Sequence, residues 1–417
     1  MSITNNTTDL RALLAKANAL PDVGGTPVLP VVQEKDVNFR DYDGTVLHSY
    51  TAAEALALTE LPAMPTNEGL ICQGWNWTLA EIQSYVANNG ACEVGALYTT
   101  DDGTTRIYIS LQKGRTSPVL RCCPNGTVTV DWGDGSATST ITGTSLTTKK
   151  YASHTYAVHG DYVIRLTVSG SVAFFGESAV GSQILANSTS TSDYRDYAYI
   201  GAIRKVEFGS GTIRLNDHAF FYAQGMDVIV MSSSVNMYGT NCFNSCYRIL
   251  HLTIPRATTA IKENCFNRAY ALRSVSFPPA ASISGNRVFN DCFTLCRATL
   301  PTGGTSTYEY LANGARSLKY MTIPYGFTTI AAFGLAYTYE IANIRVPSTV
   351  TTIAASAFEY CTSLKKLRFD RTTPPTVANS SAFTKIPTDC VISVPVGSLA
   401  TYKAATNYPS TLTYIEE

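Results

Sequence analysis

The groups that could carry chemistry in this sequence are paired carboxylates, five histidines and eleven cysteines. Asp41/Asp43 and Asp101/Asp102 stand beside Asp-Gly turns and offer the oxygen ligands that calcium prefers. Neither pair is followed by the remaining ligand positions of an EF-hand loop, so turn formation explains both pairs better. The histidines are scattered along the chain, and the cysteines lack the spacing of a zinc site with partner histidines.

A further group, Asp131, Asp134 and His154, has the residue types of a hydrolytic site. Because glycines alternate with the two aspartates, we expect these residues to fix a tight turn and a strand corner. The sequence contains no G-x-S-x-G, P-loop, H-E-x-x-H or dinucleotide-binding pattern. We therefore expect a chain that is not an enzyme and needs no cofactor or metal. A carbohydrate-active enzyme is the disfavoured alternative, since a glycosidase needs only two carboxylates across a cleft.

A sequence repeat determines the strands that position the other polar groups. Prolines at 255, 278, 301, 324 and 347 are 23 residues apart, and each ends a short alternating strand. A fixed period of this length predicts a solenoid of stacked coils over residues 203–417. Its end needs a cap, because an open end would expose the core and an unpaired strand. The aromatic column that fills the solenoid reads Phe220, Phe243, Phe266, Phe289, Ala312, Leu335 and Phe358.

Strand residues alternate between the core and the surface, so the repeat also predicts an outward strand face. The outward pairs begin with His251/Thr253 and Ser274/Ser276, and become basic and aromatic further along. Arginine forks and an aromatic platform suit anionic or hydroxyl-rich glycans. Ordinary solvated strand residues are the alternative, since threonine is favoured by β propensity. A rival patch on the turn side holds Tyr337, Tyr339 and Tyr360. The candidate ligand-binding residues are Arg297, Tyr320, Asn343, Arg345, Lys366 and Arg368.

The cysteines fit the repeat better than a disulfide framework. Their number is odd, and Cys246, Cys292 and Cys361 occupy a column of small residues three positions after the aromatic column. We expect them to be buried free thiols.

The N-terminal half divides into smaller pieces. Residues 1–30 hold a short amphipathic helix at 8–19 and a Pro/Gly linker, and residues 31–115 read as a small α+β module. Two hairpins are expected around Asp43-Gly44 and Asp102-Gly103. Capping boxes, Thr51 with Glu54 and Thr78 with Glu81, predict two helices, of which Gly90 ends the second. Alternating residues at 116–170 predict half-buried strands, and residues 171–202 join this domain to the first coil and cap it.

Composition limits the partners. Lysine plus arginine equal aspartate plus glutamate at 31 each, so bulk charge gives no reason to expect nucleic acid. The sequence contains no run of about 18 apolar residues, so we expect no membrane insertion. We also read no secretory signal at the start of the sequence, which favours release by lysis over export.

Three resemblances follow from these motifs. The pattern F-x-x-C/A-x-x-L followed by x-x-L-x-I-P, as in "CFNSCYRILHLTIP" and "AFEYCTSLKKLRF", resembles the BspA-like leucine-rich repeat family over residues 203–417. The tail "VISVPVGSLATYKAATNYPSTLTYIEE" resembles the C-terminal cap of that family, which implies a last strand, a proline, a helix around Tyr402–Ala405 and a final edge strand. "VTVDWGDGS", "HTY" and "GDYVIRLTVSG" resemble a PKD-type domain. This resemblance implies a small β-sandwich over residues 116–170, of a type that acts mostly as a spacer or adhesion module. "VNFRDYDGTVLHSYT" resembles an N-terminal module of prophage tail appendage proteins from gut Firmicutes.

Together these resemblances imply a multidomain, β-rich, tail-fibre-like receptor-binding protein of a phage or prophage. Its solenoid would bind a bacterial surface glycan or protein, and its N-terminal region would dock on the tail particle. A homotrimer would suit a fibre, since avidity multiplies weak contacts, although a three-turn helix cannot specify one. The expected location is the virion, or the medium after lysis. The alternative is a BspA-like adhesin on the bacterial cell surface that binds host or matrix protein.

Overall fold

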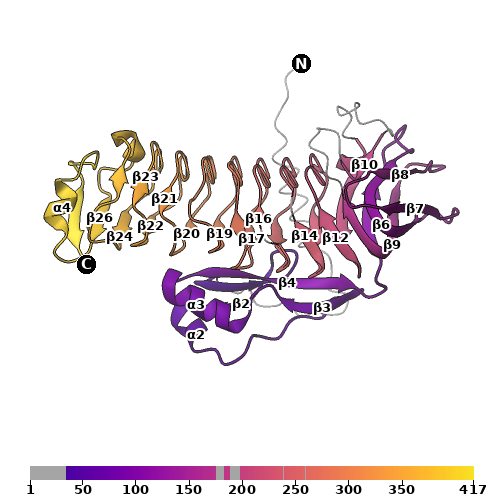
Figure 1. Ribbon diagram of the computed structural model, residues 1–417, viewed down its shortest axis with the longest axis horizontal. Coiled ribbons are helices and arrows are strands. Elements are labelled where there is room, and N and C mark those ends of the chain that lie inside the picture. The colour runs from indigo at the N-terminus through magenta and orange to yellow at the C-terminus, as the bar shows by residue number, and fades with distance from the viewer. Residues whose placement is uncertain (1–33, 175–182, 188–197, 238, 259) are drawn as a thin grey trace, which may run out of the picture. The chain divides into compact units, whose positions relative to one another are not determined.

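The structure, a computed structural model, describes residues 34–417 except 175–182, 188–197, 238 and 259 (Figure 1). The predicted helix at 8–19 and its linker lie outside the described residues. The first described element is an α+β module with one four-stranded sheet in the order β2-β1-β4-β3. Its elements are β1 (Val37–Arg40), β2 (Val46–Tyr50), α2 (Ala52–Leu56), β3 (Leu70–Trp75), α3 (Leu79–Asn89) and β4 (Cys92–Thr100).

Local sequence signals determine most of this module. The hairpin around Asp43-Gly44 forms, because β1 and β2 pair antiparallel. Both capping boxes are present, with each threonine accepting a backbone N–H and each glutamate returning the bond. Gly90 ends α3 at φ 86°, a left-handed conformation that glycine adopts without steric cost.

The second predicted hairpin does not form. β4 and β5 (Thr105–Ser110) are joined by a short turn, but they belong to different sheets. β3 pairs with the end of β4 on one edge, and on the other edge the N–H groups of Tyr98 and Thr100 donate to the carbonyls of Met231 and Phe208, so no edge is left for β5. β5 pairs antiparallel with β9 (Asp161–Phe174) and β11 (Ile203–Glu207) instead, and so joins the sandwich to the solenoid.

The sandwich is built on two long antiparallel strands, β9 and β6 (Val119–Asp131). β6 also pairs with β7 (Ser139–Thr144), β8 (Lys150–Ser153) and β10 (Leu185–Ala186). The end of β9 pairs in parallel with β12 (Thr212–Leu215), the first strand on the second side of the solenoid. Hydrogen bonding is therefore continuous across residue 203, the predicted start of the solenoid. One buried core extends from the sandwich to the C-terminal coils.

The solenoid is confirmed, with its predicted 23-residue period. Figure 1 shows the coils stacked in sequence order. Adjacent strands are parallel, and His251 is opposite Ser274 while Arg297 is opposite Tyr320. After the 3-10 turn η1 (Ile200–Ala202), the strands of the first side are β11, β13 (Val228–Val230), β15 (His251–Thr253), β17 (Ser274–Ser276), β19 (Arg297–Thr299), β20 (Tyr320–Thr322), β22 (Asn343–Val346), β24 (Lys366–Phe369), β26 (Val391–Val394) and β27 (Thr413–Glu416).

A second side carries shorter parallel strands, and the C-terminal cap closes the stack as predicted. The cap runs from β26 through Pro395 and α4 (Leu399–Lys403) to β27, which pairs with β26. The second-side strands are β12, β14 (Val235–Met237), β16 (Ala260–Ile261), β18 (Ser282–Ile283), β21 (Thr329–Ile330), β23 (Thr352–Ile353) and β25 (Thr376–Val377), followed by η2 (Ser380–Phe383).

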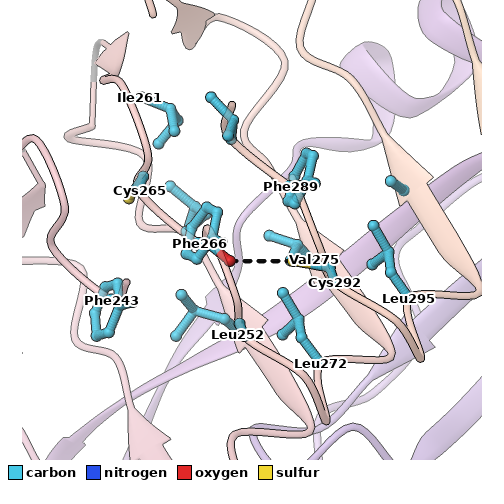
Figure 2. Close-up of a cluster of buried hydrophobic side chains, with 14 of the residues drawn as sticks. Phe243, Leu252, Ile261, Cys265, Phe266, Leu272, Val275, Phe289, Cys292 and Leu295 are labelled. Carbon is cyan, nitrogen blue, oxygen red and sulfur yellow. Dashed lines mark hydrogen bonds between the residues drawn. The ribbon is translucent and has the colours of Figure 1, made fainter. Parts of the chain in front are cut away.

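The predicted aromatic column forms a stack of rings inside the coils. Figure 2 shows Phe243, Phe266 and Phe289 in this stack, with centroids 5.9 and 5.6 Å apart. The thiol of Cys292 donates to the carbonyl oxygen of Phe266, which ties the small-residue column to the coil before it. Ala312 and Leu335 replace rings in two coils, and both side chains are buried in the same core.

On the third side of each coil, the backbone adopts an unusual conformation. The residues two before and two after the aromatic column have positive φ, for example Asn264 at 55° and Arg268 at 59°. Such values are uncommon for residues with a side chain and cost about 1–2 kcal/mol each. In return, alternate N–H groups donate to the next coil, as from Phe266 to Val288 at 3.0 Å. The stacking of coils therefore stabilises a conformation that a single coil would not keep.

Candidate functional site: the strand face of the solenoid

The α+β module covers the first half of the predicted strand face. Its strand β4 contacts β13, β15, β17 and β19 (Figure 1). Ser276 Oγ donates to the backbone carbonyl of Glu93 at 2.7 Å, and the Glu93 N–H donates to Thr299 Oγ1 at 3.0 Å. The Asn76 amide donates to the carbonyls of Ile254 and Ser276 at 3.1 Å each. The outward residues of these coils are therefore partners of the module.

A buried charge cluster lies at the centre of this contact. The Glu93 carboxylate accepts from Arg40 and, at 2.6 Å, from Arg297, and all three side chains are at most 6% exposed. Glu34 lies at the rim, 3.0 Å from Arg40. Burial acts to lower the pKa of the Arg40 guanidinium. The negative charges of Glu93 and Glu34 and their hydrogen bonds together have the larger effect, so the pKa of Arg40 is raised. Two guanidinium groups thus share one buried carboxylate.

This cluster corrects the candidate role of Arg297. Its Nε binds Glu93 and its Nη2 donates to the Lys35 carbonyl at 2.8 Å. Since the side chain is enclosed, it is not part of an open ligand face. Tyr320 in the next coil covers it with its ring, 4.4 Å from the guanidinium carbon.

The outward residues of the earlier coils are also enclosed. His251 is buried, and its ring nitrogens lie 2.7 Å from Ser274 Oγ and 3.3 Å from Thr253 Oγ1. Burial, and then the nearby Arg40, lower the pKa of His251 to about 3. Gly95 of β4 approaches Thr253 so closely that a Cβ there would lie 2.2 Å from its Oγ1. The fit between the module and this part of the face leaves no room for a ligand.

The open half of the strand face begins at Tyr320. Tyr320, Asn343, Arg345 and Arg368 are exposed, and Lys366 is partly exposed. These are the five candidate residues that remain accessible, and their role in binding stays a prediction.

The cations of this open half are paired. Arg345 and Arg368 donate to different oxygens of Asp370, at 2.5 and 2.9 Å. Lys366 Nζ lies 2.5 Å from Glu417. Arg345 also donates to the carbonyl of Asn88, the penultimate residue of α3, at 3.0 Å. The open half is therefore a polar surface of nearly balanced charge rather than a strong anion site.

Sequence reasoning did not find the residues of the module that border this surface, Asn88 and Asn89. A signal for the docking was present in β4, where every residue except Thr99 is buried. A strand that is buried on both faces must be covered twice. In "CEVGALYTT", small and apolar residues occur on both faces, which is the pattern of such a strand.

The rival patch on the turn side consists of aromatic rows. Tyr337 stacks on Tyr360 with centroids 4.9 Å apart, and Tyr339 packs edge-on against Tyr337. Another row continues from Tyr247 through Tyr270 to Phe293. Because ring faces within these rows cover one another, the rows are packing contacts between coils with half-buried edges at the surface.

The other candidate groups have structural roles. Asp131 and Asp134 accept backbone N–H groups from Gly133 and Ser136, and His154 lies 2.7 Å from Asp134. Hydrogen bonds from Ser136 and His154 lower the pKa of Asp134 to about 2. The predicted turn and corner roles are thus confirmed.

The cysteines and the possible metal ligands also give no sign of a chemical site in the described residues. The cysteines of the small-residue column are buried free thiols, as predicted. Within the described residues, no three His, Cys, Asp or Glu side chains are grouped as a metal site would need.

The fold and this surface define a leucine-rich-repeat solenoid with an associated α+β module. Residues 189–314 and 285–395 match the BspA type leucine-rich repeat region, in six copies. The C-terminal half of the chain is therefore a BspA-type repeat region, as the sequence motifs predicted. The matched residues do not include the sandwich strands β6–β9 or the α+β module. No curated protein matches the chain significantly.

Solved structures with a similar repeat come from several bacteria. A leucine-rich repeat protein from Bacteroides ovatus is 17% identical, with a TM-score of 0.29, over 51% of this chain and 68% of that one. A leucine-rich cell surface protein from Faecalibacterium prausnitzii is 14% identical, with a TM-score of 0.24, over 50% and 77%. The pneumococcal vaccine antigen PcpA is 13% identical, with a TM-score of 0.28, over 51% and 68%. Such low scores carry no argument about ligands.

None of the helices in the described part of the chain combines the length and the apolarity that a membrane crossing requires.

Proposed function

We propose that this chain is a non-enzymatic binding protein that holds a surface ligand on the open half of its strand face. The observation that carries this proposal is the division of that face. Its first coils are enclosed by specific contacts with the module, whereas Tyr320, Asn343, Arg345 and Arg368 remain exposed. A BspA-type solenoid, as an extended surface of stacked strands, supports a binding role.

In its finer form, the proposal is a tail-fibre-like receptor-binding protein of a phage or prophage whose ligand is on the bacterial surface. The sequence "VNFRDYDGTVLHSYT" and the PKD-like motifs support this form. The alternative is a bacterial surface adhesin that binds host or matrix protein. Particle docking and trimer formation would involve residues 1–30, which lie outside the described residues.

The test uses the full-length chain, because residues 203–417 alone would lose the pairing of β11 with β5 and of β12 with β9. Binding is measured to a panel of whole bacterial cells and to immobilised host matrix proteins. Saturable binding to a narrow set of strains supports the tail-fibre form, and binding only to matrix proteins supports the adhesin. Absence of binding to both kinds of surface contradicts the proposal.

The site is tested with Arg345→Ala/Arg368→Ala, for which we expect at least a tenfold loss of cell or matrix binding. A matched control is Arg268→Ala/Arg287→Ala, which removes two similarly exposed and paired arginines from the turn side. Since Asp370 loses both partners in the first variant, we also expect a small loss of stability, about 1 kcal/mol. Unchanged binding by the first variant would place the ligand elsewhere.

A further inference from the structure

Docking of the module creates a cleft that neither the solenoid nor the module has alone. The C-terminal end of α3 lies over the coils, and hollows of about 450 and 150 Å³ open beside it. Asn88 and Asn89 line both hollows. The larger one reaches Thr302 and Tyr325, and the smaller one reaches Asn343 and Arg345 on the open half of the strand face.

The walls of this cleft are fixed. Tyr85 of α3 donates its hydroxyl hydrogen to the Leu300 carbonyl at 2.8 Å. The backbone N–H of Tyr325 donates to Asn89 Oδ1 at 2.9 Å, and Arg345 donates to the Asn88 carbonyl at 3.0 Å. A cleft held in this way is preformed, so a ligand would not have to order its walls.

The lining chemistry is neutral and polar with one aromatic surface. Tyr325 is 54% exposed. Asn343 presents an amide for which the described residues supply no hydrogen-bond partner, and an amide both donates and accepts. The charged groups at the two ends are already paired, Glu81 with Arg256 at 2.6 Å and Arg345 with Asp370 at 2.5 Å.

These features select a class of ligand. Paired charges argue against phosphate-rich or strongly acidic ligands, which would need free cations. Peptides usually add a strand to an exposed sheet edge. β20 and β22 are the end strands of two separate sheets, but they contact each other within the stack of coils, so neither edge is open to a further strand. Amides and hydroxyls around an aromatic face suit the hydroxyl groups and apolar ring faces of sugars.

We propose that the cleft between α3 and coils β20–β22 binds a neutral, hydroxyl-rich saccharide, with Tyr325 as its platform and Asn343 and Asn88 as hydrogen-bonding partners. This inference rests on the proposed binding function and names the ligand class and the residues that would recognise it.

The experiment probes the full-length chain on an array of neutral and acidic oligosaccharides. The best neutral oligosaccharide is then titrated by calorimetry against wild type, Tyr325→Ala and Asn343→Ala. We expect each variant to weaken binding at least tenfold, with far-UV circular dichroism and melting temperature unchanged. The control is Tyr151→Ala, since Tyr151 is equally exposed at 53% but lies on β8 of the sandwich.

Three results would overturn the inference: binding of acidic oligosaccharides or peptides alone, no oligosaccharide binding at millimolar concentration, or wild-type affinity in both cleft variants. Cell or matrix binding that persists in both cleft variants would reject the cleft and leave the proposed function standing. Loss of binding in Arg345→Ala/Arg368→Ala, with cleft variants unaffected, would assign the ligand to the outer strand face.

Discussion

The buried Glu93 should be the residue on which docking of the α+β module depends most. Its carboxylate accepts hydrogen bonds from Arg40, Arg297 and Asn38, and its side chain is only 2% exposed. In Glu93→Gln the volume is kept, but the charge shared by two buried guanidinium groups is lost. The NH₂ group of the new glutamine is a donor, and it faces side chains that are themselves donors, so it finds no acceptor.

The size of the effect follows from burial. Removing one partner of a buried ion pair costs about 3–5 kcal/mol, because the remaining charge is left without compensation. Glu34 stays within reach of both arginines at the rim, 3.0 Å from Arg40 and 3.6 Å from Arg297. We therefore expect the lower end of the range, about 3 kcal/mol.

Tryptophan fluorescence provides the assay. Trp75 and Trp77 are buried in the module, and the remaining tryptophan, Trp132, is in the sandwich. Urea unfolding followed by emission wavelength should show an earlier module transition in Glu93→Gln. The control is Glu54→Gln, whose partner Lys35 is exposed, so its module transition should stay close to that of the wild type. Equal, small losses in both variants would refute the reasoning that the buried cluster holds the module in place.

Three further outcomes are expected. Gly95→Ala should speed hydrogen exchange of β4 amides, because its Cβ would lie 2.2 Å from Thr253 Oγ1, and Thr253→Ala should partly reverse this. Phe266→Ala should lower the free energy of unfolding by about 3–5 kcal/mol in urea denaturation followed by circular dichroism, and a loss under about 1 kcal/mol would contradict the ring stack. Burial and Arg40 lower the pKa of His251 to about 3. Between this pH and about 6.5, His251 is therefore protonated in the unfolded chain but not in the folded chain. Stability should thus fall by about 2 kcal/mol on going from neutral pH to pH 5, and urea denaturation of His251→Gln should lack this part of the loss.

The repeat could be predicted from sequence because each coil repeats the same columns in one register. Inward residues such as Phe266 and the small Cys292 are specified in every coil, and the structure stacks them as expected. The helices after the capping boxes at Thr51 and Thr78 were predicted in the same way, whereas the hairpin expected at Asp102-Gly103 did not form because the coils occupy that edge of β4. These features depend on neighbours within one coil or one helical turn.

The failures arose where contacts join distant parts of the chain. Arg297 and Asn343 occupy the same outward column of the repeat, so their local sequence gives no reason to distinguish them. One is buried because Glu93, 204 residues earlier, lies against it, and the other is exposed. The left-handed residues of the turn side escape prediction for a similar reason. Asn264 and Arg268 adopt a costly conformation because the next coil accepts their N–H groups.

The docked module also decides where along the solenoid a ligand can bind. In a stack of similar coils, each coil presents the same pattern, so the repeat itself defines no preferred position. Covering the strands from β13 to β19 removes this equivalence, and the C-terminal end of α3 marks the boundary. Beyond it, Tyr320, Tyr325 and Asn343 are accessible. We infer that the position of the site follows from where the module ends rather than from the repeat consensus, so variation in α3 would alter ligand choice without any change in the coils.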